Sequence, residues 1–310
     1  MILTVCLNPA IDKSLSVEML TVDGVNRVVS TRRDPGGKGI NVAKVVRNLG
    51  GETLATGILG GSTGEYIQKK LDALGIAHDF VIREAPTRTN LKISDLHRHT
   101  MTELNEPGEP VTDEELNAVW DKINNTVKPG DIVVFAGKNP PGMADDVLAK
   151  WITALRERGI VTALDTVDEA MRLGVAAKPS VIKPNREELS DFYGEPLHYQ
   201  RDILAAAREI VESGVERVVV SLGGDGAMFV TAKEVLLASG IRVEVKSTVG
   251  SGDAMLAALL YGIEKGESWE ETARLAVAAA TANVMMGGSQ APKLEQLEPL
   301  LSQVEITHLS

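Results

Sequence analysis

The stretch Asp131-Ile132-Val133-Val134-Phe135 is a short, continuous apolar run, and a second run, Ile160-Val161-Thr162-Ala163-Leu164, follows it after about one helix length. Between the two runs, residues 144–158 carry apolar side chains at helical spacing. Short β-branched runs separated by amphipathic helices are typical of βαβ units, whose parallel strands are buried on both faces. This stretch therefore predicts a parallel sheet with helices on both sides.

The same alternation extends along the chain in both directions. Further strand-like runs lie at residues 2–7, 54–58, 180–182 and 217–222, and helical stretches lie at 39–49, 64–74, 113–127 and 200–213. Two last strands at 227–230 and 234–238 precede a region predicted to be helical from Asp253 to about residue 301. Because neither a repeat nor a flexible linker divides the chain, we predict one α/β domain over residues 1–310. Its core is a doubly wound, mostly parallel sheet flanked by helices.

Two segments interrupt this alternation and have extended patterns with no helix between them. They are residues 13–17 with 26–32, and residues 89–95 with 100–104. We interpret the inserted segments, about 10–33 and 88–106, as a small β-sheet lid over one edge of the domain. The alternative is a pair of irregular surface loops.

Composition limits the kind of partner. A net charge of −11 argues against nucleic acid or an anionic membrane as the main partner. Any phosphate site must therefore use local cations and backbone N–H groups. Cys6, the one cysteine, lies in an apolar run and is predicted to be a buried core thiol. Without a signal-like segment or an apolar stretch long enough to span a bilayer, the sequence is typical of a cytoplasmic protein.

The most informative motif is Val249-Gly250-Ser251-Gly252-Asp253, between an extended segment and a very apolar helix. Two glycines around a serine allow successive backbone N–H groups to point the same way, and the helix N-terminus adds its dipole. The result would be an anion hole for a transferring phosphoryl group. Asp253 would then be the base that activates an accepting hydroxyl, with a pKa depressed by the helix dipole. The alternative is that Asp253 is an ordinary N-cap.

Three other stretches indicate a functional site, but each is less specific than the motif before Asp253. Gly36-Gly37-Lys38-Gly39-Ile40-Asn41 permits close backbone approach and supplies one cation, but it lacks the spacing of a Walker loop. Asn185 and Glu188, three apart at a helix start, suit Mg²⁺ or form a helix cap. Gly223-Gly224-Asp225-Gly226 follows a buried strand and is either a hairpin turn or the floor of a nucleotide site.

Together, in this order and spacing, these stretches resemble the ribokinase-like sugar kinases of the phosphofructokinase B branch, over nearly the whole chain. The resemblance implies an α/β fold with a β lid, ATP and Mg²⁺. It implies that Asp253 is the base, that Gly250, Ser251 and Gly252 form the anion hole, and that Asn185 and Glu188 are associated with the metal. It also implies a nucleotide side lined by Lys183, Asn185, Ser221, Gly223, Gly226 and Ser247.

The resemblance extends to the substrate side. Residues 4–12, ending in Asp12, are similar to hexose-phosphate kinases, and Thr87-Arg88-Thr89-Asn90-Leu91-Lys92 is similar to fructose-1-phosphate kinases. The implied substrate residues are Asp12, Gly37, Lys38, Asn41, Arg88 and Asn90, with Lys38 and Arg88 on the sugar's phosphate. The family commonly dimerises through the lid, and we expect Arg27 of the lid to reach the partner's site.

One segment departs from the family pattern. Where Ser-Gly-Ser-Leu-Pro is usual, this chain has Ala136-Gly137-Lys138-Asn139-Pro140, so Lys138 is a candidate substrate residue at the end of a central strand. The expected reaction is ATP-dependent phosphorylation of fructose 1-phosphate to fructose 1,6-bisphosphate. The alternatives are a tagatose-6-phosphate kinase, a 6-phosphofructokinase, a kinase of an unphosphorylated sugar or nucleoside, and a catalytically inactive sugar-binding regulator.

Overall fold

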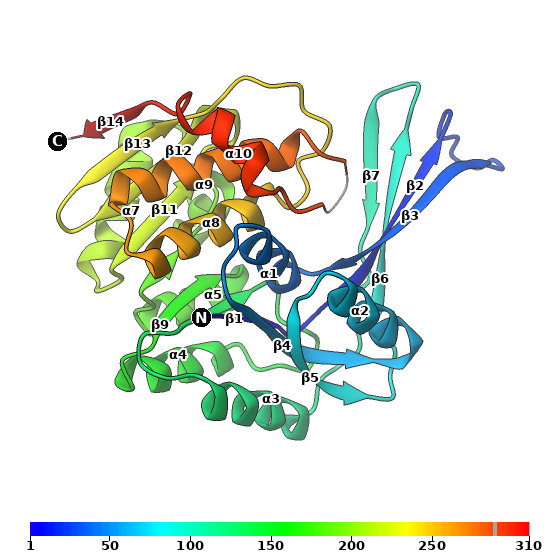
Figure 1. Cartoon of the computed structure of the whole chain (residues 1–310), viewed down its shortest axis with the longest axis horizontal. Helices are drawn as coiled ribbons and strands as arrows, with labels where there is room; N and C mark the ends of the chain where they lie inside the picture. The colour runs from blue at the N-terminus through cyan, green and yellow to red at the C-terminus, as the bar shows by residue number, and fades with distance from the viewer. Residues whose placement is uncertain (288–289, 310) are drawn as a thin grey trace.

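A computed structural model describes residues 1–287 and 290–309. Its core is a ten-stranded sheet with several crossovers (Figure 1). In spatial order the strands are β14 (Ile306–Leu309), β13 (Val235–Ser239), β12 (Gly226–Thr231), β11 (Arg217–Ser221), β10 (Val181–Ile182), β9 (Val161–Asp165), β8 (Ile132–Ala136), β1 (Ile2–Cys6), β4 (Thr53–Gly60) and β5 (Ala77–Arg83).

The strands from β11 to β5 are parallel, and β12, β13 and β14 add an antiparallel edge. Every residue of β1 and β8 is buried, as expected of strands covered on both faces. Side chains of β8 alternate between two cores, with Val133 and Phe135 in one and Ile132 and Val134 in the other. The predicted doubly wound, mostly parallel sheet is confirmed.

Helices cover both faces of the large sheet (Figure 1). One face carries α1 (Lys38–Asn48), α8 (Ser251–Lys265), α9 (Trp269–Val284) and α10 (Leu294–Leu301), and α2 (Gly61–Ala73) lies beside α1. The other face carries α3 (Asp113–Thr126), α4 (Val147–Glu157), α5 (Asp168–Ala176), α6 (Arg186–Tyr193) and α7 (Gln200–Glu212). Helix α8 is buried along most of its length, which accounts for its nearly all-apolar sequence.

A second sheet of four strands projects from the main body (Figure 1). Its order is β3 (Val28–Gly36), β2 (Ala10–Val17), β6 (Arg88–Asp95) and β7 (Thr100–Leu104). Both predicted extended pairs form antiparallel pairs, and β2 and β6 join them by parallel pairing. The alternative of irregular loops is thereby excluded. We call this sheet the lid sheet.

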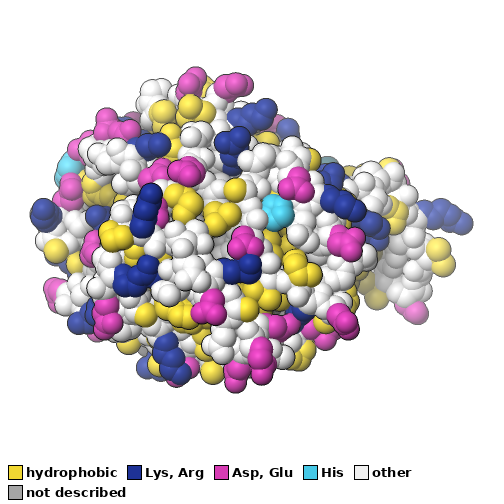
Figure 2. Space-filling view, turned by 60° about the horizontal axis from the view of Figure 1, so that its bottom comes forward, with side chains coloured by type: hydrophobic (Ala, Val, Ile, Leu, Met, Phe, Trp, Pro, Cys, Tyr) yellow, Lys and Arg dark blue, Asp and Glu magenta, His cyan; other side chains and the backbone are white. Residues whose placement is uncertain are grey.

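No sequence pattern predicted β5 or β14, which lie at the two edges of the large sheet. Edge strands are partly exposed and so lack the continuous apolar run of a buried strand, as the mixed burial of β5 illustrates. Cys6 is buried as predicted, and burial raises the pKa of its thiol to about 11. Over the described ranges, every helix is too short or too polar to cross a bilayer. Figure 2 shows Lys and Arg side chains interspersed with Asp and Glu over one face of the body.

Candidate active site

The glycine-rich segment before α8 builds the N-terminus of that helix. Gly250 is the N-cap and has φ 82°, a left-handed conformation that glycine adopts without strain. Ser251 begins the helix, and Asp253 lies in its first turn with 6% of its surface exposed. Asp253 is therefore not the N-cap. The N–H groups of this turn give the segment the partial positive charge expected of an anion hole, and that of Ser251 also donates to the carbonyl oxygen of Thr248 at 3.3 Å.

Asp253 is held by the other glycine-rich motif. Asn41 Nδ2 of α1 donates a hydrogen bond of 2.8 Å to Asp253 Oδ2, and both side chains are buried. The sequence predicted a depressed pKa for Asp253, and this prediction is wrong. Burial, followed by the charge of Asp165, raises its pKa, although Lys38, Asn41 and Lys183 oppose the shift. The tertiary burial of the carboxyl group outweighs the local helix dipole.

Lys38 lies among acidic groups at the carboxyl ends of the central strands. Its Nζ is 3.0 Å from Asp165 Oδ1 and 3.8 Å from Glu188 Oε1. Burial alone would lower the pKa of Lys38, but the charges of Asp165, Asp253 and Glu188 outweigh burial and raise it. Lys38 is therefore a fixed cation beside Asp253.

Asp165 completes this charged centre, and sequence reasoning missed it. Its carboxylate is buried at the end of β9, with Lys38 on one oxygen and Lys183 Nζ 3.6 Å from the other. Burial would raise the pKa of Asp165, but Lys183 and Lys38 more than compensate and lower it. An Asp that ends a buried apolar run was a usable signal, because functional groups gather at the carboxyl edge of parallel sheets.

The nucleotide-side candidates come together around the start of α6. Asn185 is the N-cap of α6 and Glu188 its third residue, and each bonds the other's backbone N–H at 2.8 Å. Ser221 pairs with Asn185 as an isolated β-bridge. Lys183 Nζ lies 3.3 Å from where a Cβ on Gly252 would be, so it adjoins the anion-hole segment. The capping box uses Asn185 Oδ1 and Glu188 Oε2, which leaves Glu188 Oε1 turned toward Lys38.

The other residues assigned to the nucleotide side are held in place by different structural constraints. Gly226 begins β12, and a Cβ there would lie 2.0 Å from the carbonyl oxygen of Ala238, so strand packing requires this glycine. Gly223 has φ 63° and open space around it. Ser247 is buried, and its Oγ accepts a bond of 3.3 Å from the N–H of Val249. Gly223 is thus available to a ligand, whereas Gly226 is structural in the first instance.

Asp12 lies at the junction of the lid sheet and the main body. Asn90 Nδ2 donates to Asp12 Oδ1 at 3.2 Å, and Lys92 Nζ is 3.0 Å from Asp12 Oδ2. All three side chains are buried. A Cβ on Gly36 would meet the Asp12 carboxylate at 2.6 Å, so β3 can pass over Asp12 only with glycine at that position. A Cβ on Gly37, the next residue, would lie 2.6 Å from Cys6 Sγ and 3.1 Å from the Cα of Pro9.

Arg88 anchors the segment that leaves the lid sheet, residues 105–110, which we call the strap. Its guanidinium donates to the carbonyl oxygens of Glu106 at 2.5 Å and Asn8 at 3.0 Å. Burial lowers the pKa of this guanidinium. Arg83 holds the same strap by donating to the carbonyl oxygens of Pro110 and Glu109. Arg88 is thus both a candidate phosphate ligand and a structural anchor.

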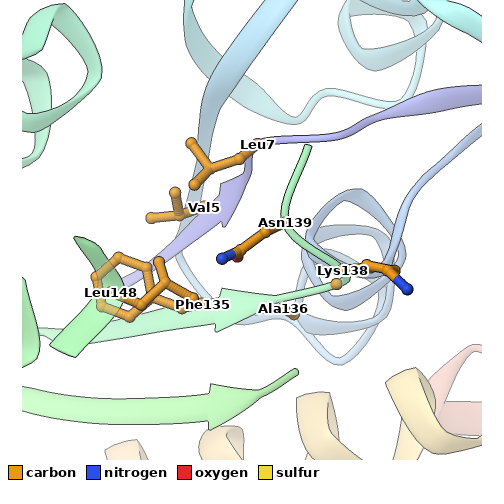
Figure 3. A pocket seen from close by; sticks show the side chains of 8 residues that line it. Val5, Leu7, Phe135, Ala136, Lys138, Asn139 and Leu148 are labelled. Carbon is orange, nitrogen blue, oxygen red and sulfur yellow. The ribbon is translucent and has the colours of Figure 1, made fainter. Parts of the chain in front are cut away.

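Lys138 and Arg27 lie outside this network of contacts. Lys138 Nζ is 3.0 Å from Asp168 Oδ2, in an ion pair whose two side chains are about 70% exposed. Figure 3 shows Asn139 turned toward a cavity of about 10 Å³ lined by Val5, Leu7 and Phe135, with the Lys138 side chain directed away from it. Arg27 is exposed, in the turn that leads into β3 of the lid sheet.

The chain is similar to known proteins over nearly its whole length. The family model described as "pfkB family carbohydrate kinase" matches residues 5–297 of this chain. The 1-phosphofructokinase of Rhodobacter capsulatus is 36% identical, covering 99% of this chain and 98% of that protein. That of Bacillus subtilis (strain 168) is 34% identical, with 100% of both covered.

Solved structures are similar over almost the same length. Phosphofructokinase-2 from Escherichia coli in complex with fructose-6-phosphate is 29% identical, with a TM-score of 0.92 and coverage of 97% of this chain and 98% of that one. The tetrameric inhibited form of the same enzyme is 30% identical, with a TM-score of 0.91 and the same coverage.

Proposed function

Because this chain belongs to the pfkB family of carbohydrate kinases, we propose that it transfers the γ-phosphoryl group of ATP to fructose 1-phosphate. The acceptor is the free 6-hydroxyl, and the products are fructose 1,6-bisphosphate and ADP. The observation that carries the proposal is the buried Asp253, held by Asn41 beside the cation Lys38 at the N-terminus of α8. The R. capsulatus and B. subtilis relatives, both 1-phosphofructokinases, support fructose 1-phosphate as the substrate.

We assign the proton transfer to Asp253. Its raised pKa makes it a stronger base than an exposed carboxylate. Asn41 fixes one carboxylate oxygen, which leaves the other for the accepting hydroxyl. Phosphoryl transfer depends more on alignment and charge stabilisation than on a strong base. The N–H groups of Gly250, Ser251 and Gly252 would receive the charge that develops on the transferring group.

The nucleotide side is assigned to Lys183, Asn185, Ser221, Gly223, Gly226 and Ser247. Mg²⁺ is usual for such kinases, and the residues present fit an ion bound mainly through waters and nucleotide phosphates. Among residues 1–287 and 290–309, no three acidic, His or Cys side chains form a metal cluster. Glu188 Oε1, which the capping box leaves unused, would hold the hydrated ion next to Asn185. When bound, Mg²⁺ would neutralise phosphate charge.

The sugar phosphate is assigned to the opposite side of Asp253, under the lid sheet. Asp12 and Asn90, already paired in register, would bind the sugar hydroxyls, with Gly37 permitting close approach. Arg88 and Lys38 would supply positive charge to the substrate's phosphate. We include Lys138 as a weaker, solvent-exposed cation, because it follows the carboxyl end of β8.

We further propose that two chains associate through their lid sheets. Several large apolar side chains of the lid sheet and its turns are exposed, and such patches on a monomer usually mark an interface. They are Met19, Val22, Val25, Val28, Val29, Met101 and Leu104. Arg27 lies in this region and would reach the partner's substrate. The tetrameric form of the E. coli enzyme supports association in the family.

A coupled assay of ADP release with a panel of acceptors tests the proposed function. The panel contains fructose 1-phosphate, fructose 6-phosphate, tagatose 6-phosphate, fructose and ribose, each with ATP and Mg²⁺. We expect kcat/KM to be highest for fructose 1-phosphate, by about tenfold or more, because the phosphate must meet fixed cations. A higher value for another acceptor would reassign the substrate, and no ADP release with any of them would indicate a sugar-binding regulator.

A further inference from the structure

Lys44 is a buried cation that interacts electrostatically with the proposed base, Asp253. It lies on α1, one turn after Asn41, and has 6% of its surface exposed. Lysines are almost never this buried without strong partners. Lys44 Nζ donates a hydrogen bond of 2.9 Å to the carbonyl oxygen of Pro35, the residue of β3 that precedes Gly36. The side chain therefore connects α1 to the base of the lid sheet.

The charges around Lys44 come from four elements. The carboxylates of Asp34 on β3, Asp12 on β2 and Asp253 on α8 favour its charged form, and Lys92 on β6 opposes it. Burial is the largest effect, and it lowers the pKa of Lys44 to about 8. Lys44 is thus mostly charged at neutral pH and loses that charge within the range in which enzymes are assayed.

A small cavity lies between Lys44 and Gly250 of the glycine-rich segment before α8. It measures about 10 Å³, the space of one water molecule, and Asn41, Lys44, Gly250 and Asn283 lie on its wall. Asn41 Oδ1 and Asn283 Oδ1 are buried acceptors to which no described residue donates a hydrogen bond. Asn41 Nδ2 donates a hydrogen bond to Asp253, so Asn41 Oδ1 is the amide atom that a nearby positive charge would stabilise. Lys44 is the cation on that wall.

We propose that Lys44 is a positioning residue for phosphoryl transfer, whose charge orients the Asn41 amide and stabilises the ionised Asp253 carboxylate. It acts on the substrate only through these two residues, and its bond to Pro35 couples them to β3. The inference rests on the proposed role of Asp253 as the base. Under this inference, Lys44 is a titrating group near the site, and phosphoryl transfer itself does not require such a group.

The test is the pH dependence of kcat with fructose 1-phosphate and saturating ATP, for three variants. Lys44→Arg keeps the charge, Lys44→Gln keeps a donor for Pro35 without the charge, and Lys44→Met removes both. We expect the wild-type kcat to fall on the alkaline side near pH 8, and Lys44→Arg to move that fall upward by about one unit or more. Lys44→Gln and Lys44→Met should lower kcat about tenfold and move the acid limb upward by about 0.5–1 unit.

Two controls make the outcomes distinct. Lys69→Met removes an exposed lysine of α2 and should leave the profile unchanged. Asp253→Asn reports on the base itself: if it keeps wild-type turnover, the proposed function fails, whatever the Lys44 variants do. If Asp253→Asn is inactive but folded Lys44→Gln and Lys44→Arg both keep the wild-type profile, the inference about Lys44 is overturned. A change in Tm alone would likewise assign Lys44 a purely structural role.

Discussion

Asn41 donates a hydrogen bond of 2.8 Å to Asp253 across a sequence separation of 212 residues. The bond forms because α1 packs against α8, so that the two glycine-rich motifs become the two walls of one site. It also ties the carboxylate that would activate the acceptor to the helix that carries Lys38. Each motif alone is ambiguous, and this contact brings the two motifs together.

The raised pKa of Asp253 predicts an acid limb in the pH profile. Only the ionised carboxylate can accept a proton, so kcat should fall as the pH drops through this pKa, above the ordinary value of about 3.9. Asn41→Ala removes a bond that lowers the pKa and should move the limb further upward. Steady-state kcat measured from acid to alkaline pH tests both, with circular dichroism to confirm folding. An acid limb that lies at or below the ordinary carboxyl value in both enzymes would contradict the prediction.

The same shift predicts that the base lowers the stability of the fold. A carboxyl group whose pKa is raised by folding stabilises the protein only when protonated, and that contribution disappears as the pH rises through the folded-state pKa. Asp253→Asn, which is neutral at every pH, should therefore raise Tm at pH 8 by about 1–3 °C. The gain should shrink toward pH 4. A lower Tm for the variant at pH 8 would show that Lys38 and Lys183 stabilise the carboxylate more than burial opposes it.

Arg88 should affect the sugar phosphate more than ATP. Arg88→Ala removes a cation assigned to the substrate's phosphate, and the loss of such a pair costs about 1.5–3 kcal/mol, or roughly 10–150-fold in KM. Arg83→Ala is the matched control, because Arg83 holds the same strap without an assigned substrate contact. If the two variants change KM for the sugar phosphate and KM for ATP equally, Arg88 only anchors the strap and does not bind the substrate's phosphate.

Arg27 should complement the site of a partner chain. Arg27→Ala and Asp253→Asn homodimers are each expected to be nearly inactive. In a mixed dimer one of the two sites would have both an intact Asp253 and an intact Arg27, so up to about half of the activity of the wild-type dimer should return. Co-expressed, differently tagged subunits purified in two steps provide the heterodimer. If verified heterodimers stay inactive, the two sites do not share Arg27 across the lid interface.

Local sequence patterns predicted the central strands, most helices and the glycine-rich start of α8, because buried parallel strands and glycine-rich helix starts have strong signatures. These patterns do not predict β5 and β14, because strands at the edge of a sheet lack a continuous run of apolar residues. The pKa of Asp253 was mispredicted because its burial comes from the packing of α1 against α8, which no local pattern encodes. Asn185 and Glu188 fit a helix cap and a metal site equally well, and the observed capping box is compatible with both.

The most direct test of the account is the turnover of Asp253→Asn with fructose 1-phosphate and ATP. The substitution keeps the size of the side chain, so both substrates should still bind, and their Kd values can be measured by calorimetry. We expect kcat to fall by roughly 10²–10⁴-fold, the usual contribution of a positioned base, while both Kd values change little. A folded variant that keeps more than half of the wild-type kcat would contradict the account.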